Sequence, residues 1–376
     1  MVNNFNAMVD KDRRGFLKKF GLGALAASAV PAITLSSTSE KNNKMEAIKK
    51  IRSLGFQWET LNPFLFCVHH EDFFPEGNGE LGPKTSLQGR NLGNDFNIKD
   101  GFRMYHGKKV PGFPGHPHRG FETLTVVRKG MVDHSDSDGG AGRYGDGDLQ
   151  WMTAGSGLLH SEMFPCIHED KENHLELFQI WLNLPAKNKM AKPDYKMFWD
   201  EDMPKFDKNG AYVEVLAGSL FGKSAPKPPN PSWANDPENH VGVYNIKIDA
   251  NKNFVLPKTA KGVNRTVYFY SGKELTIEDK NIPEYHAVDV NPEMDIKLKT
   301  GKDEVKILIL QGKPIDEPVV QHGPFVMNTR QEIQEAFSEY QRTQFGGWPW
   351  KEYEKTHGKD AGRFAKYADG TIEKKA

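Results

Sequence analysis

Short apolar runs, separated by turn-forming residues, are the feature that most constrains how this chain can fold. Between residues 52 and 183 such runs recur at residues 64–68, 122–127, 148–152 and 175–182. Glycine, proline, asparagine and aspartate interrupt the chain between them, and the whole sequence holds 36 glycines and 23 prolines. Strands this short and this regularly interrupted are typical of a β-sandwich or a β-barrel.

A second strand-rich stretch follows later in the chain. Its apolar runs lie at residues 212–216, 241–248, 265–270, 295–298 and 305–310. The segment from Pro185 to Pro204 is rich in lysine, proline and methionine, and it is predicted to cross from one domain to the next. At roughly 150 residues per domain, the chain is long enough for two. We therefore predict an all-β protein with two successive barrels.

One helix is predicted near the C-terminus. Asn328 can cap its first turn, and Gln331 stands three residues later, as in a capping box. Four apolar residues then fall on one helical face, namely Ile333, Ala336, Phe337 and Tyr340. The glycines at 346–347 are expected to end the helix. The charged residues 351–376 are expected to lie loosely on the surface.

The N-terminal segment is predicted to be a targeting signal. Arg13 and Arg14 precede a mildly apolar run over residues 20–35, which is too short and too interrupted to span a bilayer. Small residues within that run offer cleavage points, and the paired arginines resemble the twin-arginine export signal of bacteria. We expect residues 1–35 to be this signal and 36–51 a flexible linker. The protein is then periplasmic or exported, or cytoplasmic if the signal does not function; the alternative is an amphipathic helix of the mature protein.

Charge and cysteine content exclude several classes of protein. The chain has 50 Lys+Arg and 50 Asp+Glu, so it has no basic excess for nucleic acid or an anionic membrane surface. Two cysteines exclude a disulfide scaffold and a cysteine-based zinc finger. The sequence does not decide whether Cys67 and Cys166 pair. Thirteen histidines, by contrast, are enough to build a metal site.

Two histidine-containing segments carry the predicted chemistry. On a strand, alternate side chains share a face, so His116, His118 and Glu122 would point one way. By the same rule His160 and Glu162 share a face. If the two strands are neighbours in one barrel, three imidazoles and a carboxylate meet. Such a set suits a divalent first-row ion with open positions, as in non-haem iron oxygenases.

Two other motifs favour simpler interpretations. The run His69-His70-Glu71-Asp72 offers metal-ligand side chains, but adjacent residues face opposite ways on a strand, which favours a solvated pair at a loop edge. The glycine-rich residues 139–147 lack the Lys-Ser/Thr of a phosphate loop and are predicted to form a hairpin turn at the barrel rim.

The motifs together resemble the pirin branch of the cupin superfamily. The matching text is His116-Pro117-His118-Arg119-Gly120-Phe121-Glu122-Thr123, Gln150-Trp151-Met152-Thr153-Ala154-Gly155, His160-Ser161-Glu162-Met163 and Trp181-Leu182-Asn183-Leu184-Pro185-Ala186, with a further match at 317–328. The resemblance extends from about Phe56 to the C-terminal helix. It implies two cupin (jelly-roll) β-barrels packed face to face: residues 52–185 with metal, 186–327 without metal, and a helix and tail over 328–376.

The resemblance also implies a site and an activity. The implied ligands are His116, His118, His160 and Glu162, with Fe(II) as the usual ion. Glu122 remains an alternative ligand, and either glutamate could serve as the catalytic base. Some members open the flavonol quercetin with dioxygen, whereas eukaryotic members act as transcriptional cofactors. We therefore expect a quercetin 2,3-dioxygenase-like oxidoreductase for a small phenolic substrate, without nucleic acid or a stable membrane anchor. The alternative is a non-catalytic, metal-dependent binding or regulatory protein. An apolar pocket wall is expected from Phe113, Phe121 and Met152.

Overall fold

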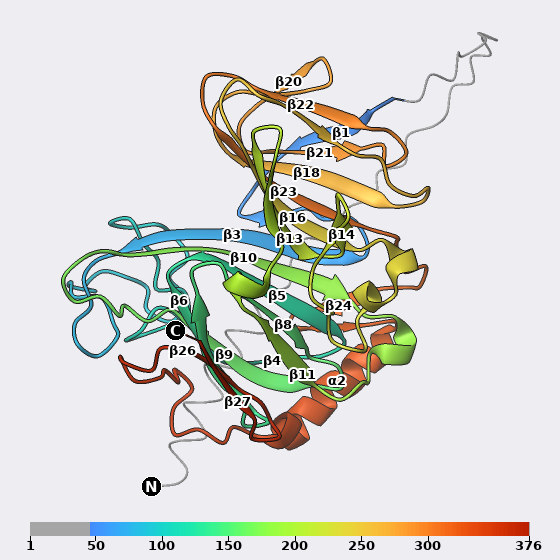
Figure 1. The fold of residues 1–376 in the computed structure, drawn as a ribbon. Coiled ribbons are helices and arrows are strands. Elements are labelled where there is room, and N and C mark those ends of the chain that lie inside the picture. Colours follow the sequence, from blue (N-terminus) through green and yellow to red (C-terminus); the bar gives the residue numbers. More distant parts are fainter. Residues whose placement is uncertain (1–45, 376) are drawn as a thin grey trace, which may run out of the picture.

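The structure is a computed structural model that describes residues 46–375. The predicted export signal at residues 1–35 and most of the predicted linker lie outside the described residues. The described chain forms two β-barrels that pack against each other, with one α-helix beside the first barrel (Figure 1). This arrangement confirms the predicted all-β architecture.

Two six-stranded sheets build the first barrel. One sheet has the order β11 (Asp194–Phe198), β8 (Leu149–Thr153), β5 (Phe121–Lys129), β10 (Asn173–Asn183), β3 (Phe64–Phe74), β2 (Gln57–Trp58). The other has the order β27 (Ile372–Lys375), β26 (Arg363–Lys366), β7 (Ala141–Gly145), β6 (Met131–Asp136), β9 (Leu158–Met163), β4 (Gly112–His118). The glycine-rich segment 139–147 begins in the turn between β6 and β7, which pair as a hairpin, and most of the rest of it forms β7.

A seven-stranded and a four-stranded sheet build the second barrel. The larger sheet has the order β1 (Ile48–Ser53), β21 (His286–Val290), β18 (Asn264–Ser271), β23 (Val305–Gly312), β16 (Gly242–Ile248), β13 (Ala211–Ala217), β12 (Lys205–Lys208). The smaller has the order β17 (Asn253–Leu256), β22 (Ile296–Thr300), β19 (Leu275–Ile277), β20 (Lys280–Ile282). Two hairpins lie outside these sheets: β14 (Ser219–Leu220) with β15 (Lys223–Ser224), and β24 (Val320–His322) with β25 (Phe325–Met327).

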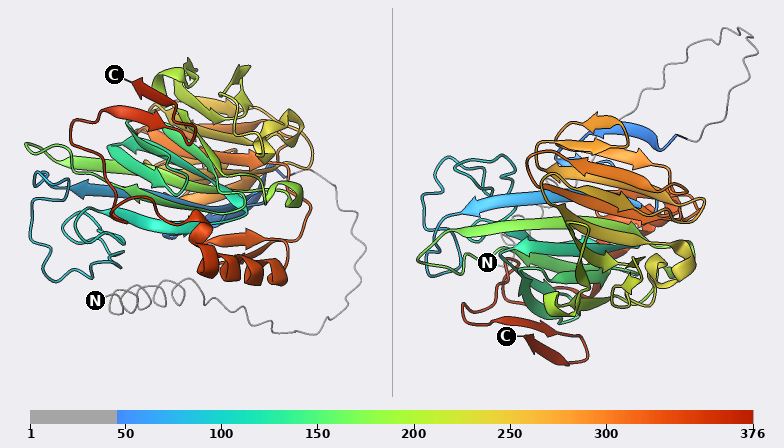
Figure 2. Two further views of the ribbon diagram at one scale, coloured as in Figure 1. Left: turned by 90° about the horizontal axis from the view of Figure 1, so that it is seen from below. Right: turned by 45° about the horizontal axis from the view of Figure 1, so that its top comes forward.

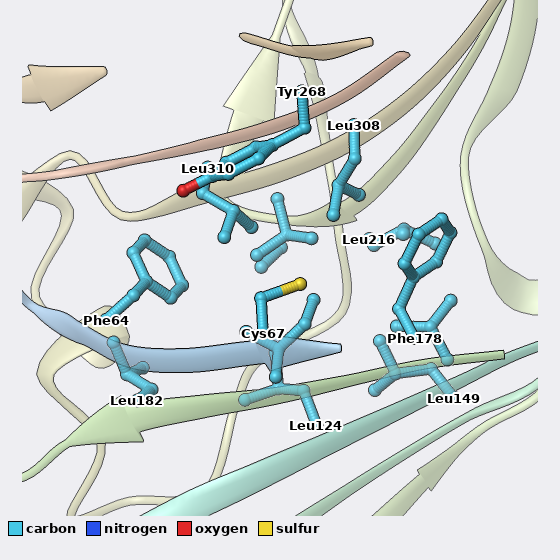
Figure 3. Close-up of a cluster of buried hydrophobic side chains, with 14 of the residues drawn as sticks. Phe64, Cys67, Leu124, Leu149, Phe178, Leu182, Leu216, Tyr268, Leu308 and Leu310 are labelled. Carbon is cyan, nitrogen blue, oxygen red and sulfur yellow. The ribbon is translucent and has the colours of Figure 1, made fainter. Parts of the chain in front are cut away.

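Alternation along the strands divides most of the buried apolar residues among three large cores. On β23, Ile307 points into the second barrel, whereas the next residue, Leu308, points toward the first barrel. Figure 3 shows the core between the barrels, where Leu308 and Tyr268 face Cys67, Leu124 and their neighbours. The two large sheets are thus joined by a continuous buried core, in addition to the core inside each barrel.

Helix α2 (Arg330–Thr343) begins one residue later than predicted. Thr329, rather than Asn328, is the N-cap, and Glu332 completes the capping box in place of Gln331. The helix ends at Gln344, which takes a left-handed conformation with φ of 51°, before the two glycines. The predicted apolar face is confirmed, because Ile333 and Ala336 are buried, and they pack on Leu159 and Phe325 beside the first barrel. Five short 3-10 helices complete the described secondary structure: Ala186–Asn188, Asp200–Asp202, Trp233–Asn235, Pro237–Asn239 and Gln344–Gly346.

Two predicted domain boundaries differ from the structure. Strand β1 lies partly in the expected linker, and it pairs with β21 of the second barrel, so the linker prediction is wrong for residues 48–51. Strand β11 lies in the range expected for the second domain, but it pairs with β8 of the first barrel. The sequence does not show these exchanges because strand pairing joins segments far apart in the chain.

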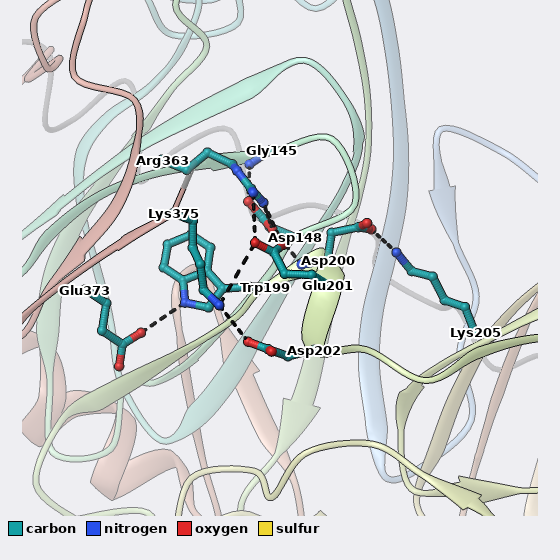
Figure 4. A network of polar contacts seen from close by, with 10 residues as sticks. All are labelled: Gly145, Asp148, Trp199, Asp200, Glu201, Asp202, Lys205, Arg363, Glu373 and Lys375. Atoms are coloured by element: carbon teal, nitrogen blue, oxygen red, sulfur yellow. Dashed lines mark hydrogen bonds and ion pairs between the residues drawn. The ribbon is translucent and has the colours of Figure 1, made fainter.

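The C-terminal tail is an ordered part of the first barrel, so the prediction of a loose tail is wrong. Strand β26 pairs with β7, and β27 pairs with β26 (Figure 2). Polar contacts fix this hairpin to the barrel (Figure 4): Arg363 donates to Asp148 and Glu201, and Trp199 Nε1 donates to Glu373 at 3.0 Å. These partners are distant in sequence, which is why charge content alone misassigned the tail.

Both cysteines are buried and free, so Cys67 and Cys166 do not pair. Within residues 46–375, no helix is long and apolar enough to cross a membrane.

Candidate metal centre

Three histidines from two adjacent strands converge inside the first barrel. His116 and His118 lie on β4, and His160 lies on β9, directly opposite His116. Their ligand nitrogens all lie within 4.8 Å of one another. The ring of His160 is 4.5 Å from that of His116 and 4.9 Å from that of His118, measured between centroids. The structure therefore brings together the three imidazoles that were predicted to meet.

All three imidazoles are held in the neutral form, which is the form that binds a metal. Burial lowers the pKa of His116 to about 4, against a weaker opposing effect of its hydrogen bond to Pro114. Burial likewise lowers the pKa of His118 and of His160 well below the usual value, and the neighbouring imidazoles add to this effect.

Several ring nitrogens of this cluster have no hydrogen-bond partner within the described chain. Nδ1 of His118 and both ring nitrogens of His160 are buried and have no such partner. His116 Nδ1 lies 3.0 Å from the Pro114 carbonyl, a contact that orients the ring and leaves Nε2 free. Buried polar atoms without partners are unfavourable by about 1–3 kcal/mol each. A divalent ion would bind one nitrogen of each ring and remove part of this cost, so these residues fit a metal site.

Glu162 lies beside the histidines on the same inward face of β9. Its Oε2 is 4.0 Å from His160 Nε2, although the carboxylate is not part of the group of three within 4.8 Å. Thr125 Oγ1 donates to Oε1 at 2.6 Å, and Gln179 Nε2 donates to Oε2 at 2.6 Å. Burial raises the pKa of Glu162, while the hydrogen bond from Thr125 opposes that rise.

Thr125 and Gln179 were missed at the sequence level, although a signal exists. Each is a polar residue within an otherwise apolar strand, β5 and β10 respectively, and the two are cross-strand partners. Polar side chains on the inward face of a strand need partners inside the barrel. Such interruptions of an apolar run therefore point to the side chains that hold a buried carboxylate.

Glu122 is placed away from the histidines. On β5 it shares the face of Leu124 and Val126, which lie in the core between the barrels. There it accepts a hydrogen bond of 2.7 Å from Thr153 Oγ1. The predicted common face with His116 and His118 assumed one continuous strand. A turn at Gly120, with φ of 85°, instead separates β4 from β5 and breaks the alternation.

Aromatic rings surround the cluster. Phe121 lies 5.0 Å from His118 and 4.4 Å from Trp181, and Phe113 lies 6.2 Å from His116, all between ring centroids. Met152, the third residue expected in the pocket wall, packs in the apolar core of the barrel. His116 is the most accessible of the three histidines. The C-terminal tail passes next to it, where Gly115 N donates to Tyr353 O at 2.9 Å.

Another histidine-containing motif differs from its prediction. His69 and His70 lie on β3 rather than at a solvated loop edge. Only 5% of the His69 side chain is exposed, and His70 is buried inside the barrel. The sequence does not show this burial because the second barrel and the segment around Tyr105 supply the covering residues.

Both barrels of this chain match family models. The model for pirin matches residues 80–182, and the model for the pirin C-terminal cupin domain matches residues 243–346. The chain is 36% identical over 251 residues to human pirin, covering 65% of this chain and 81% of pirin. It is 37% identical over 235 residues to a Pseudomonas aeruginosa protein provisionally named quercetin 2,3-dioxygenase, covering 61% of this chain and 79% of that protein.

A solved structure has the same fold. The quercetin 2,3-dioxygenase from Acinetobacter baumannii aligns with a TM-score of 0.61 and 26% identity, over 80% of this chain and 96% of that one. Matches to both domain models, the identity to human pirin over most of its length and the shared two-barrel fold agree. The chain therefore belongs to the pirin family of the cupin superfamily.

Proposed function

We propose that the protein is an exported, metal-dependent dioxygenase of flavonol or related phenolic substrates, of the quercetin 2,3-dioxygenase type. The observation that carries this proposal is the cluster of three neutral imidazoles with unpartnered ring nitrogens, next to a buried carboxylate. The similarity to proteins named quercetin 2,3-dioxygenase supports the substrate class.

The proposed ion is Fe(II), held by His116, His118 and His160, with Glu162 as the fourth ligand. Imidazole and carboxylate donors suit a divalent first-row ion. When bound, the ion would supply Lewis acidity toward a phenolic or enolic hydroxyl.

The protein's own side chains prepare the substrate. Glu162 accepts the proton of the substrate hydroxyl, a role suited to a carboxylate whose pKa is raised by burial. Thr125 and Gln179 keep its oxygens in place through the hydrogen bonds described above. The rings of Phe113 and Phe121 bind a flat aromatic substrate and exclude water from the reacting atoms.

Oxygen uptake tests the proposal. Iron-loaded protein is expected to consume oxygen on addition of quercetin, and His160→Ala is expected to lose bound iron and turnover together. His286→Gln, a substitution on β21 of the second barrel, serves as the control and should retain both. Full activity in a metal-free His160→Ala preparation would contradict the proposal.

A second candidate is a metal-dependent binding or regulatory protein without turnover. The contact of Gly115 with Tyr353 favours it, because the C-terminal tail restricts the space beside His116. No oxygen uptake across a panel of flavonols and catechols, with the metal still bound, would support this candidate over the enzyme.

Export is proposed from the paired arginines at positions 13 and 14 and the apolar run that follows them. Replacing both arginines with lysine should retain the protein in the cytoplasm of a bacterium that has twin-arginine transport. Unchanged periplasmic recovery of that variant would contradict the proposal.

A further inference from the structure

A second group of metal-binding side chains lies outside the barrel interior, on the face of the first sheet that borders the second barrel. Strand β3 carries His69, Glu71 and Phe73 at alternate positions, and β10 carries His174, Glu176 and Phe178 with the same spacing. The two copies of the pattern His-x-Glu-x-Phe pair antiparallel, with Glu71 directly opposite Glu176. Each histidine lies directly opposite the phenylalanine of the other strand.

The pairing places two imidazoles on either side of two carboxylates. The ring of His174 stacks on Phe73 at 4.4 Å, and that of His69 stacks on Phe178 at 4.7 Å, between centroids. His174 Nε2 lies 3.3 Å from Glu71 Oε1, and His69 Nε2 lies 3.2 Å from Glu176 Oε1. Stacking thus orients each imidazole toward a carboxylate.

The distances within this group fit a small divalent ion. Ligand atoms of Glu71, His174 and Glu176 all lie within 4.8 Å of one another. Tetrahedral ligands at about 2.0–2.2 Å from zinc are separated by about 3.4 Å, so small side-chain rotations would close the site. Nε2 of His174 is buried, and within residues 46–375 its one polar contact is the 3.3 Å approach to Glu71, which does not meet hydrogen-bond geometry, so this nitrogen is available as a ligand.

The charges in this group call for a cation. Two carboxylates directly opposite each other on neighbouring strands repel. Arg128, the nearby guanidinium, already forms an ion pair of 2.6 Å with Glu214. The two carboxylates would balance the charge of one divalent ion.

The group is accessible from one side. The side chains of Glu71 and His174 are 42% and 33% exposed, whereas those of Glu176 and His69 are 9% and 5% exposed. The ring of His69 lies 5.1 Å from that of Tyr270 of the second barrel, so the group borders the junction of the two barrels. An ion can therefore enter from solvent and reach ligands fixed by the fold.

We propose that Glu71, His174 and Glu176 bind a second divalent transition-metal ion of the zinc type, with His69 orienting the Glu176 carboxylate. This site is separate from the barrel cluster and does not depend on the proposed dioxygenase activity. An ion at this position would link β3 and β10 where they border the second barrel, and it would stabilise the folded chain.

Zinc stoichiometry tests this second site in the full-length protein. Chelator-treated protein is titrated with Zn²⁺ alone, and bound zinc is measured after gel filtration. The unmodified chain is expected to bind two equivalents, the double variant Glu71→Gln/His174→Gln one equivalent, and His160→Ala one equivalent. His69→Gln is expected to weaken the second site by about 10–100-fold while leaving two equivalents at saturation.

Two further variants separate this proposal from the barrel site. The combination of His160→Ala with Glu71→Gln/His174→Gln should bind no zinc, whereas His286→Gln should still bind two equivalents. Circular dichroism checks that each variant is folded; Glu71 and His174 are partly exposed, so their replacement should be tolerated. The proposal is overturned if Glu71→Gln/His174→Gln binds as much zinc as the unmodified chain, or if His160→Ala alone binds none.

Discussion

Glu122 and Glu162 are both buried glutamates of the first barrel, but their surroundings differ. Glu162 receives hydrogen bonds on both oxygens, whereas Glu122 receives one from Thr153 and its Oε2 has no partner among the described residues. Burial raises the pKa of Glu122 to about 7, and the hydrogen bond from Thr153 opposes this rise. A group of this kind is protonated in the folded chain over much of the acidic range.

The first prediction follows from the pKa of Glu122. Because the folded-state pKa lies above the unfolded value of 4.5, its contribution to stability is complete below pH 4.5 and is lost as pH rises to about 7. The shift corresponds to about 3 kcal/mol. Glu122→Gln removes this ionisation, so its free energy of unfolding relative to the unmodified chain should rise by about 3 kcal/mol over that range.

Urea denaturation at a series of pH values measures this difference. Parallel stability profiles for Glu122→Gln and the unmodified chain would show that Glu122 does not titrate in this way. The comparison between the two chains cancels the pH dependence of all other groups.

At the scale of elements, Arg143 on β7 connects the C-terminal tail to the first barrel. Its guanidinium forms two hydrogen bonds of 2.7 and 2.8 Å with the buried carboxylate of Asp133. It also donates to the carbonyl oxygens of residues 357–359, at distances of 2.8–3.1 Å. One fully buried cation thus holds together a strand pair and the segment that leads to β26.

The second prediction concerns this connection. Arg143→Met leaves Asp133 buried without its cation, which should destabilise the chain by about 3–5 kcal/mol. The segment around residues 357–359 also loses its anchor, so limited proteolysis under native conditions should cut there faster than in the unmodified chain.

Lys359→Met is the control for this prediction, because the ion pair of Lys359 with Glu169 is exposed. It should change neither the denaturation midpoint nor the cleavage rate appreciably. An Arg143→Met protein with the stability and protease resistance of the control would show that the guanidinium does not anchor the tail.

At the scale of the whole molecule, a buried core joins the two barrels, so we expect them to unfold together. Leucines and aromatic residues from both large sheets fill this core (Figure 3). Strand β1, early in the described chain, completes the second barrel, and the last two strands extend the first. The second barrel therefore depends on a strand that precedes the first barrel in the chain, and the first barrel depends on strands that follow the second.

The third prediction is that damage inside one barrel is transmitted to the other. Ile307→Ala creates a cavity inside the second barrel, on the side of β23 that faces away from the first barrel, and should destabilise the second barrel by about 2–5 kcal/mol. Hydrogen exchange should then show reduced protection in β5 and β10 of the first barrel by a similar free energy.

Lys299→Ala, at an exposed position of β22 in the second barrel, is the control and should leave both barrels unchanged. Unaltered protection of β5 and β10 in Ile307→Ala would mean that the barrels unfold independently.

Much of the fold was predictable from the sequence, because strand alternation and turn residues are local signals. The apolar runs predicted as strands, the two-barrel architecture and the apolar face of α2 are all present in the structure. The predicted start of α2 was wrong by one residue, because Asn328 and Thr329 are both good N-cap residues. Which of the two caps the helix depends on how the preceding chain enters it.

For the candidate site, the sequence by itself determined that His116, His118 and His160 could meet, because their spacing suits adjacent strands. Tertiary structure decided the rest. The turn at Gly120 placed Glu122 on the opposite face from the histidines, and β10 brought Gln179 to Glu162. Pairing of β3 with β10 created the Glu71–Glu176 group from two motifs about a hundred residues apart. Local sequence sets which way a side chain alternates, but only long-range pairing sets which strand it meets.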